Sequence, residues 1–356
     1  MATIRGTKLE IEIDKKYIAA VICLLSVKPR EAFIAITYAC NAKCVMCNIW
    51  QNQSRDEMAI EHYAKVPRTL KTINITGGEP FLRKDIVQLV KTIDSAVPDA
   101  RLVFSTNGSM TDVILSRLAE IRSFHDNIGV GVSIDGLELV HDRIRGVTGF
   151  FGRALSTVEK LKGQGYEDLR IAMTLVDQNA NQVKEVYDLS KRLGVEFTLT
   201  AAHDSELYFQ KTDNTSVDFL LESSPRLAEV MLCQLRSGSP KDWFRAYHTM
   251  GIMDSSVRRR FASECEAGCN YFFMSPSGDV YPCNVMNLKI GNISKVARWD
   301  DLFTEEAEMR MRGEVQECRK NCWMICNTKS LMRAHPVRVG TWILSHKIPA
   351  HLKHAH

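Results

Sequence analysis

Between residues 33 and 201, short runs of β-type residues alternate with longer runs whose apolar residues recur at helical spacing. Six runs have the composition of strands: 33–38, 71–76, 101–106, 128–134, 169–176 and 195–201. Four runs have the spacing of helices: 86–97 (with Asp85 as its N-cap), 111–122, 150–163 and 181–193. This alternation predicts parallel strands joined by right-handed crossovers. Both forms of such a sheet, open or closed into a partial barrel, place the chemistry at the carboxyl ends of the strands.

Composition excludes several other classes of protein. The 356 residues are 45% hydrophobic and 25% charged, which is ordinary for a folded chain, and the net charge of +4 gives no indication of a nucleic-acid partner. The longest apolar run, Tyr17–Val27, is too short to span a bilayer. No small-residue cleavage site follows it, so we predict an N-terminal helix packed on the domain.

Nine of the eleven cysteines fall into two groups, and only Cys23 and Cys233 stand alone. Clustered thiols in a chain without a secretion signal indicate metal ligands in a cytoplasmic protein. The first group, Cys40-x3-Cys44-x2-Cys47, follows the first predicted strand. Three thiolates at this spacing can hold three corners of a cubane iron–sulfur cluster and leave one iron open. Structural zinc sites usually collect four ligands, so zinc fits less well.

These cysteines, together with Gly77-Gly78-Glu79-Pro80 after the second strand, resemble the radical S-adenosylmethionine (SAM) superfamily. The resemblance implies an α/β fold, a partial (β/α)6 TIM-like barrel, with a [4Fe–4S] cluster on the cysteine triad. It also implies that SAM chelates the open iron. One electron from an external donor such as flavodoxin or ferredoxin then yields a 5′-deoxyadenosyl radical that abstracts hydrogen from the substrate.

The same resemblance assigns further residues to the SAM site. Gly77 and Gly78, with Glu79 beside them, would lie against the SAM amino group, since glycine lets the backbone approach a ligand closely. Ser133, at the end of the fourth strand, would touch the ribose. Arg145, in His141-Asp142-x2-Arg145-Gly146, would pair with the SAM carboxylate, a task that suits a guanidinium group.

Four residues have weaker assignments. Asp135 would either face the substrate or cap a turn, while Thr174 and Asn179 are lesser candidates for SAM contacts. Met46 departs from the pattern, because the residue before the third cysteine is often aromatic in this superfamily. A polarizable thioether can still pack near adenine.

The second cysteine group resembles the SPASM/twitch extension of this superfamily, which holds auxiliary [4Fe–4S] clusters. It consists of Cys265, Cys269, Cys283, Cys318, Cys322 and Cys326. The full SPASM motif has a longer cysteine series, and no cysteine follows Cys326. We therefore favour one auxiliary cluster over two, with Cys265, Cys283 and two of the last three cysteines as ligands and Cys269 as an alternative. A spare thiol such as Cys269 could donate a hydrogen atom and make the reaction an epimerisation. An auxiliary cluster that accepts an electron would favour oxidation or bond formation.

The chain is expected to divide into five parts. They are an N-terminal helical extension (1–30), the radical SAM barrel (31–205), a helical connection (206–262), a small Cys-rich auxiliary-cluster domain (263–330) and a basic amphipathic tail (331–356). The N-terminal run and the tail could together lie on a membrane surface. Packing of both against the barrel is the favoured interpretation.

Only about thirty residues precede the first strand, which leaves no room for an N-terminal peptide-recognition domain. We therefore expect a small-molecule substrate, such as a sugar, nucleoside or lipid. Abstraction of a hydrogen atom from one of its carbons would lead to oxidation, epimerisation or bond formation. A peptide-modifying maturase is the alternative enzyme. A non-catalytic iron–sulfur electron carrier is the alternative of another class.

Overall fold

The computed structural model describes residues 28–54, 56–214, 224–254, 264–318, 320 and 322–352. The apolar run Tyr17–Val27 and nearly all of the expected N-terminal extension lie outside the described residues. No helix in these ranges is long and apolar enough to cross a membrane.

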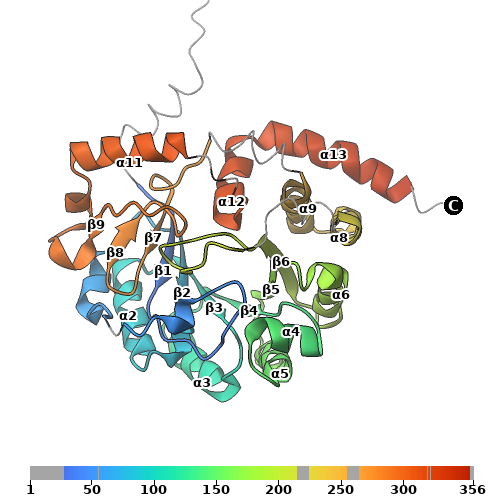
Figure 1. The fold of residues 1–356 in the computed structure, drawn as a ribbon, viewed down its shortest axis with the longest axis horizontal. Helices are drawn as coiled ribbons and strands as arrows, with labels where there is room; N and C mark the ends of the chain where they lie inside the picture. The colour runs from blue at the N-terminus through green and yellow to red at the C-terminus, as the bar shows by residue number, and fades with distance from the viewer. Residues whose placement is uncertain are drawn as a thin grey trace, which may run out of the picture.

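Six parallel strands form the barrel in sequence order, as predicted (Figure 1). They are β1 (Glu31–Ala35), β2 (Thr72–Thr76), β3 (Arg101–Thr106), β4 (Ile128–Ser133), β5 (Leu169–Leu175) and β6 (Glu196–Ala201). β1 begins two residues earlier and ends three residues earlier than expected. Beyond Ile36, whose N–H donates to the Thr76 carbonyl at 2.9 Å, the chain leaves the sheet and turns into the loop that carries the first cysteines.

Helices and short 3-10 turns surround the barrel. They are η1 (Ile49–Gln51), η2 (Ile60–Lys65), η3 (Pro80–Leu82), α2 (Ile86–Ala96), α3 (Thr111–Arg122), α4 (Glu138–Arg145), α5 (Phe150–Gly163), η4 (Ala180–Gln182) and α6 (Val183–Arg192). Of these, η1 lies at a cavity on the open end of the barrel. α2 buries Ile86, Leu89, Val90 and Ile93, the face that its apolar spacing predicts. Asp85 occupies the N-cap position but makes no capping bond; its carboxylate pairs instead with Arg83 at 2.8 Å. α4 has too few apolar residues to be found by periodicity.

The sheet does not end at β1. β7 (Tyr271–Met274) pairs parallel with the other side of β1, and β8 (Asp279–Tyr281) and β9 (Gly291–Asn292) follow as antiparallel strands. The result is one nine-stranded sheet in the order β6-β5-β4-β3-β2-β1-β7-β8-β9. Phe272 and Trp299 belong to the same apolar core as the barrel. The Cys-rich region therefore extends the barrel sheet, with only a smaller core of its own around the cysteines.

The remaining elements lie beside and above the barrel in Figure 1. They are α8 (Ser224–Arg236), α9 (Pro240–Met253), η5 (Ile293–Lys295), η6 (Trp299–Leu302), α11 (Glu305–Glu317), α12 (Ile325–Ala334) and α13 (Pro336–Leu352). One expectation needs correction here, because residues 206–214 of the predicted helical connection are not helical. The predicted amphipathic tail forms the end of α12 and all of α13.

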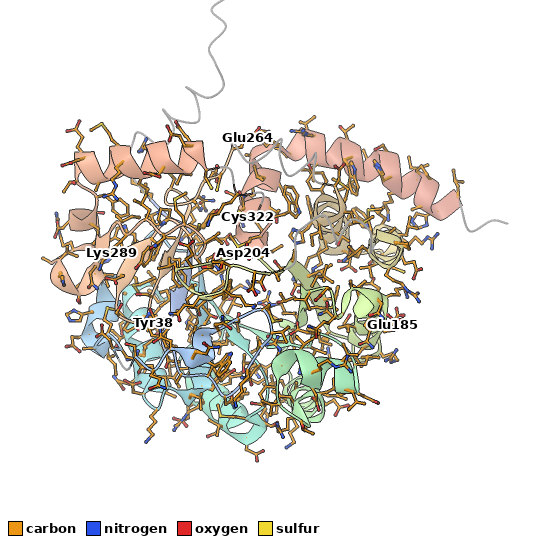
Figure 2. All side chains as sticks on the ribbon, viewed as in Figure 1. Tyr38, Glu185, Asp204, Glu264, Lys289 and Cys322 are labelled. Atoms are coloured by element: carbon orange, nitrogen blue, oxygen red, sulfur yellow. The ribbon has the colours of Figure 1, made fainter. Side chains whose placement is uncertain are left out.

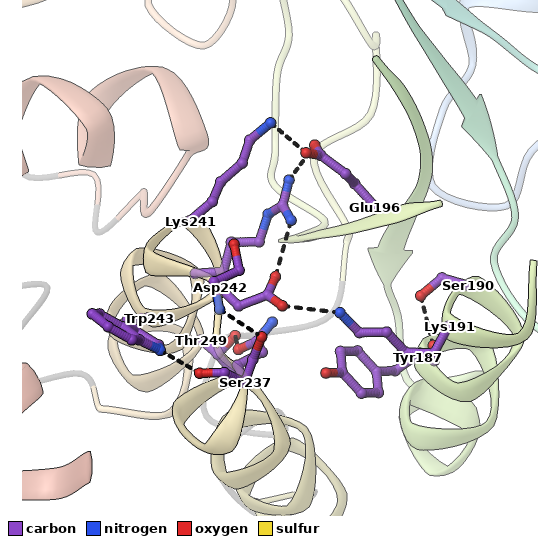
Figure 3. Close-up of polar contacts among 12 residues, drawn as sticks. Tyr187, Ser190, Lys191, Glu196, Ser237, Lys241, Asp242, Trp243 and Thr249 are labelled. Carbon is purple, nitrogen blue, oxygen red and sulfur yellow. Dashed lines mark hydrogen bonds and ion pairs between the residues drawn. The ribbon is translucent and has the colours of Figure 1, made fainter. Parts of the chain in front are cut away.

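Ion pairs fasten α9 to the barrel edge (Figure 3). Glu196 on β6 accepts from Lys241 and Arg245 of α9. Asp242 of α9 accepts from Arg245 at 3.2 Å and from Lys191, at the end of α6, at 3.0 Å. Because Arg245 and Asp242 are each mostly buried, these shared charges hold α9 more firmly than isolated surface pairs would.

α9 also supports the segment that carries the last cysteines, through Trp323. The Trp323 indole donates to the His248 carbonyl at 2.8 Å, and its ring lies against Gly251. A Cβ atom at residue 251 would be 2.2 Å from this ring. Glycine at this helical position is therefore required by the packing of Trp323.

We expect Gly251→Ala to lower the free energy of unfolding by about 1–3 kcal/mol, the usual cost of overpacking a core. Gly313→Ala in α11 is the matched control, because nothing lies within 4 Å of its Cβ position. Alanine there should stabilise the helix by about 0.5–1 kcal/mol. Urea unfolding of both variants checks this, and a Gly251→Ala protein as stable as the control would contradict the packing described.

Candidate active site

A cavity of about 250 Å³ opens at the carboxyl ends of the barrel strands. Its lining includes all three thiols of the first cysteine group and six further residues that the sequence singled out: Met46, Gly77, Gly78, Ser133, Arg145 and Thr174. These residues are spread over 135 positions of the chain, and the parallel strands bring them to one edge of the sheet.

The cysteine loop is held by the backbone at the end of α4. The Lys43 N–H donates to the Arg145 carbonyl at 2.8 Å, and the Val45 N–H donates to the Ile144 carbonyl at 2.9 Å. Gly146, with φ +68°, allows this approach, because a Cβ atom there would lie 2.5 Å from the Lys43 carbonyl oxygen. The arginine and glycine of the sequence motif thus position the cysteine loop through their backbone.

Gly77 and Gly78 pack against the beginning of the same loop. The Gly78 N–H donates to the Thr37 carbonyl, and the Glu79 N–H donates to the Ala39 carbonyl, both at 2.8 Å. A Cβ atom on Gly78 would lie 2.2 Å from the Ala39 carbonyl oxygen. The close packing of residue 78 against the Ala39 carbonyl therefore requires glycine, whether or not a ligand also contacts it.

The Glu79 side chain does not line the cavity. It is fully buried and accepts from Thr106 Oγ1 at 2.8 Å and from the Asn107 N–H at 2.7 Å. Burial raises the pKa of this carboxyl to about 7, although these donors act in the opposite direction. Glu79 thus ties the turn after β2 to the end of β3.

Arg145 and Asp135 form a buried ion pair beneath the cavity. Arg145 Nη2 lies 2.6 Å from Asp135 Oδ2, and Asp135 Oδ1 accepts from the Thr174 N–H at 2.8 Å. Burial alone would lower the pKa of Arg145, but the Asp135 carboxylate outweighs it and keeps the guanidinium charged. Asp135 is completely buried and is not among the residues that line the cavity, so the structure places it under Arg145 and not against a substrate.

Arg145 also faces the first cysteine group. Its Nη1 lies 3.5 Å from Cys44 Sγ, and its Nε has no hydrogen-bond partner. An unpartnered buried donor on a cation beside the cavity suits an anionic group such as a carboxylate. The residue therefore fits the role that the resemblance implies.

Two buried side chains hold the loop that carries Asp135. His141 Nδ1 accepts from the Asp135 N–H at 3.0 Å, and burial lowers the pKa of this histidine to about 3, so it stays neutral. Asn179 donates to the Asp135 and Thr174 carbonyls, both at 2.8 Å, and lies outside the lining of the cavity. Both residues therefore position Asp135. From the sequence alone, this positioning role cannot be distinguished from a direct contact with a ligand.

The three thiols suit an iron–sulfur cluster by their chemistry. Burial raises the pKa of Cys40 and of Cys47 to about 12 and also raises that of Cys44, although Arg145 opposes this in all three. Thiolates in this place need positive charge beside them, which coordinated iron supplies. The triad, an open cavity and an adjacent cation thus fit a cluster that binds a second ligand.

Residues 203–214, which we call the strap, run from the end of β6 across the cysteine loop. Ser205 and Lys211 pair through backbone bonds of 2.8 and 3.1 Å, which folds the strap into a short hairpin. The Phe209 carbonyl accepts from the Asn48 N–H at 2.8 Å, and Phe209 lines the cavity. The buried Tyr208 hydroxyl donates to the Gly77 carbonyl at 2.7 Å. Sequence reasoning missed the strap, although adjacent aromatic residues in a polar stretch were a signal.

The strap also reaches the second cysteine group. Ser205 Oγ donates to the Asn284 carbonyl, next to Cys283, at 2.6 Å. In Figure 2, Asp204 of the strap lies between Cys322 above it and Tyr38 below it. The strap therefore connects the two regions that contain cysteines.

Five thiols of the second group gather around one small gap. Cys265, Cys283, Cys318 and Cys322 line it, and Cys326 is buried in the same apolar core. Cys269 packs against that core but is neither in this lining nor in that of the first cavity. A donor set made only of thiols suits an iron–sulfur cluster.

The gap itself is about 20 Å³, space for roughly one water. The four cysteines that line the gap lie in segments without regular secondary structure. Within the described ranges, no group of three or more His, Cys, Asp or Glu side chains is arranged to hold a metal ion.

The family model described as "Radical SAM superfamily" matches residues 34–190. The barrel region of this chain is thus similar to radical SAM proteins, and the Cys-rich region follows it. It is 27% identical to the mycofactocin maturase MftC of Mycolicibacterium smegmatis, over 80% of this chain and 74% of that protein. It is 26% identical to the sporulation killing factor maturation protein SkfB of Bacillus subtilis (82% and 68%) and 23% identical to a probable GTP 3′,8-cyclase of Metallosphaera sedula (77% and 86%).

Solved structures share the fold. Streptococcus suis SuiB bound to S-adenosylmethionine superposes with a TM-score of 0.62 at 16% identity, over 86% of this chain and 72% of that one. Native anSMEcpe with bound AdoMet superposes with a TM-score of 0.53 at 17% identity, over 89% and 100%. The partial barrel with a Cys-rich C-terminal region is thus confirmed as the fold class.

Arg145→Gln is expected to weaken SAM binding at least tenfold, because a charge-assisted hydrogen bond is worth about 1.5–3 kcal/mol. Arg143→Gln is the matched control, since Arg143 lies exposed on the same helix. Equilibrium dialysis of the reconstituted proteins measures the affinity. Because the variant also breaks a buried ion pair, its thermal stability and iron content are compared with those of the control. Wild-type affinity in a folded Arg145→Gln protein would contradict the assignment.

Proposed function

We propose that this enzyme binds a [4Fe–4S] cluster through Cys40, Cys44 and Cys47, binds SAM in the adjoining cavity, and modifies a peptide precursor. Binding of the cluster and of SAM is supported by one observation: the three cysteines line the same cavity as Gly77, Gly78 and Arg145. When bound, the cluster supplies the electron that cleaves SAM to a 5′-deoxyadenosyl radical, which abstracts a hydrogen atom from the substrate.

The chain's own residues bind and orient SAM in this proposal. Arg145, kept charged by Asp135, holds the SAM carboxylate close to Cys44. The backbone beside Gly77 and Gly78 meets the amino group, and Ser133 and Thr174 on the opposite strands face the ribose and adenine. Phe209 and Trp50 line the same cavity and exclude water from the reacting groups.

The second cysteine group is proposed to hold one auxiliary [4Fe–4S] cluster. Its ligands are Cys265, Cys283 and two of Cys318, Cys322 and Cys326, all of which surround one core. Two cysteines of this group, Cys269 and one of the last three, then remain without iron. Cys269 is not proposed as a hydrogen donor, because it lies outside the lining of the SAM cavity.

A peptide substrate is supported by the relatives and replaces our main expectation of a small molecule. MftC and SkfB are described as maturation enzymes, and SuiB has been solved with its precursor peptide SuiA at a TM-score of 0.59. A small-molecule substrate remains the second candidate, because relatives described as a GTP cyclase and a heme synthase match over similar lengths.

Iron analysis after anaerobic reconstitution tests the two clusters. We expect about eight irons per chain in the wild type and about four after Cys40, Cys44 and Cys47 are all replaced by alanine. Replacing Cys233, which stands apart on α8, by alanine is the control and should leave the iron content unchanged. About twelve irons in the wild type would show two auxiliary clusters, and zinc in place of iron would refute the radical mechanism.

The substrate class is tested with heat-treated extract of the source cells. An extract fraction that contains the substrate should raise the rate of 5′-deoxyadenosine formation from SAM and a reductant, and the triple cysteine variant should form none. Protease digestion of the fraction should abolish this stimulation if the substrate is a peptide. Stimulation that survives digestion and passes a dialysis membrane would identify a small molecule instead.

A further inference from the structure

Helix α13 is fixed to the protein by one face. Val339, Ile343 and Ala350 are buried against α8 and α9. The Arg236 Nε–H donates to the Ala350 carbonyl at 2.9 Å, and Lys347 donates to the Leu235 carbonyl at 2.7 Å. Since α9 is itself tied to the barrel by the ion pairs of Figure 3, α13 rests on a rigid support.

The opposite face of α13 is also apolar, and it is exposed. Val337 is 81% exposed, and Leu344, Ile348 and Leu352 are 63%, 62% and 66% exposed. Their spacing of seven, four and four residues places them in one line along the helix, about 22 Å long. We call these four side chains the α13 ridge. Thr341 is also exposed between Val337 and Leu344, so the line is apolar mainly over its second half. Exposed apolar side chains gathered on one helix face mark a contact with something outside the chain.

The sequence of α13 and the residues beside it in the chain contains no acidic residue, although Glu31 of β1 pairs with Lys329 and Arg333 of α12. Residues 325–356 contain five Lys and Arg residues and five of the ten histidines, but none of the 42 acidic residues. The rest of the chain is nearly balanced, with 41 basic and 42 acidic residues. The positive charge of the whole protein thus comes from this C-terminal stretch.

We propose that the α13 ridge docks on a membrane surface that contains anionic phospholipid. An apolar helix face with basic and without acidic neighbours inserts between lipid headgroups, whose negative charge attracts the basic residues. Pairing with a second copy through this face would bring basic residues against basic residues, with no acidic partner. The ridge is a convex helix face without a groove of its own, so a flat, deformable lipid layer fits it better than a peptide does.

Docking in this way is independent of the proposed reaction. It would hold the barrel at the membrane through α13, α8 and α9, none of whose residues line the SAM cavity. The substrate would then be met at the membrane, or delivered there.

Vesicle sedimentation tests the proposal with the full-length reconstituted enzyme. We expect the wild type to sediment with vesicles of equal parts phosphatidylglycerol and phosphatidylcholine, and much less with phosphatidylcholine alone. The double variant Leu344→Ser/Ile348→Ser should bind at least about tenfold more weakly, because each side chain loses its transfer into the apolar layer. Added salt should weaken wild-type binding.

Met309→Ser is the matched control, because Met309 is 62% exposed on the acidic helix α11. It should bind vesicles like the wild type, and all three proteins should cleave SAM at the same rate without vesicles. The proposal is overturned if the wild type stays in the supernatant or if the double variant binds as well as the wild type. It is also overturned if light scattering shows a wild-type dimer that the double variant converts to monomers.

Discussion

The buried pair of Arg145 and Asp135 is the interaction on which the site depends. Two opposite charges removed from water are stable only while each has its partner and its remaining hydrogen bonds are made. Asp135 receives these bonds from Thr174, and its loop is held by His141 and Asn179. The backbone of Arg145 carries the cysteine loop. One residue therefore couples the end of β4, the triad and the cavity.

The two cysteine groups are joined by structure at two places. β7 pairs with β1, which leads directly into the first cysteine loop, and the strap bonds to both Gly77 and Asn284. The second cysteine group and the first cavity are thus connected through the same backbone elements.

Local patterns were sufficient to predict the six barrel strands, and the family resemblance led to several cavity residues such as Gly77, Ser133 and Arg145, whereas Trp50 and Phe209 of the same cavity were missed. Strand periodicity is a local property, and the triad and Gly77-Gly78 have fixed spacings. The roles of Glu79, Asp135 and Asn179 could not be predicted in the same way, because a buried polar residue and a ligand contact have the same sequence signal. The pairing of β7 with β1 joins residues about 240 positions apart, which no local pattern reveals. The segment of α13 was predicted only as a basic amphipathic tail. Because α13 has apolar residues on both its buried and its exposed face, the sequence does not show which face packs on the protein.

The place of β1 in the sheet has a consequence for how such proteins can be divided. With β2 on one side and β7 on the other, β1 is an interior strand, and Ala32 and Ile34 are fully buried. A barrel cut off before β7 would turn this strand into an edge, with unpaired backbone groups and bare apolar side chains that recruit other chains. We therefore expect the barrel to aggregate when it is expressed without β7, and a chimera that exchanges the C-terminal region must supply a strand in its place.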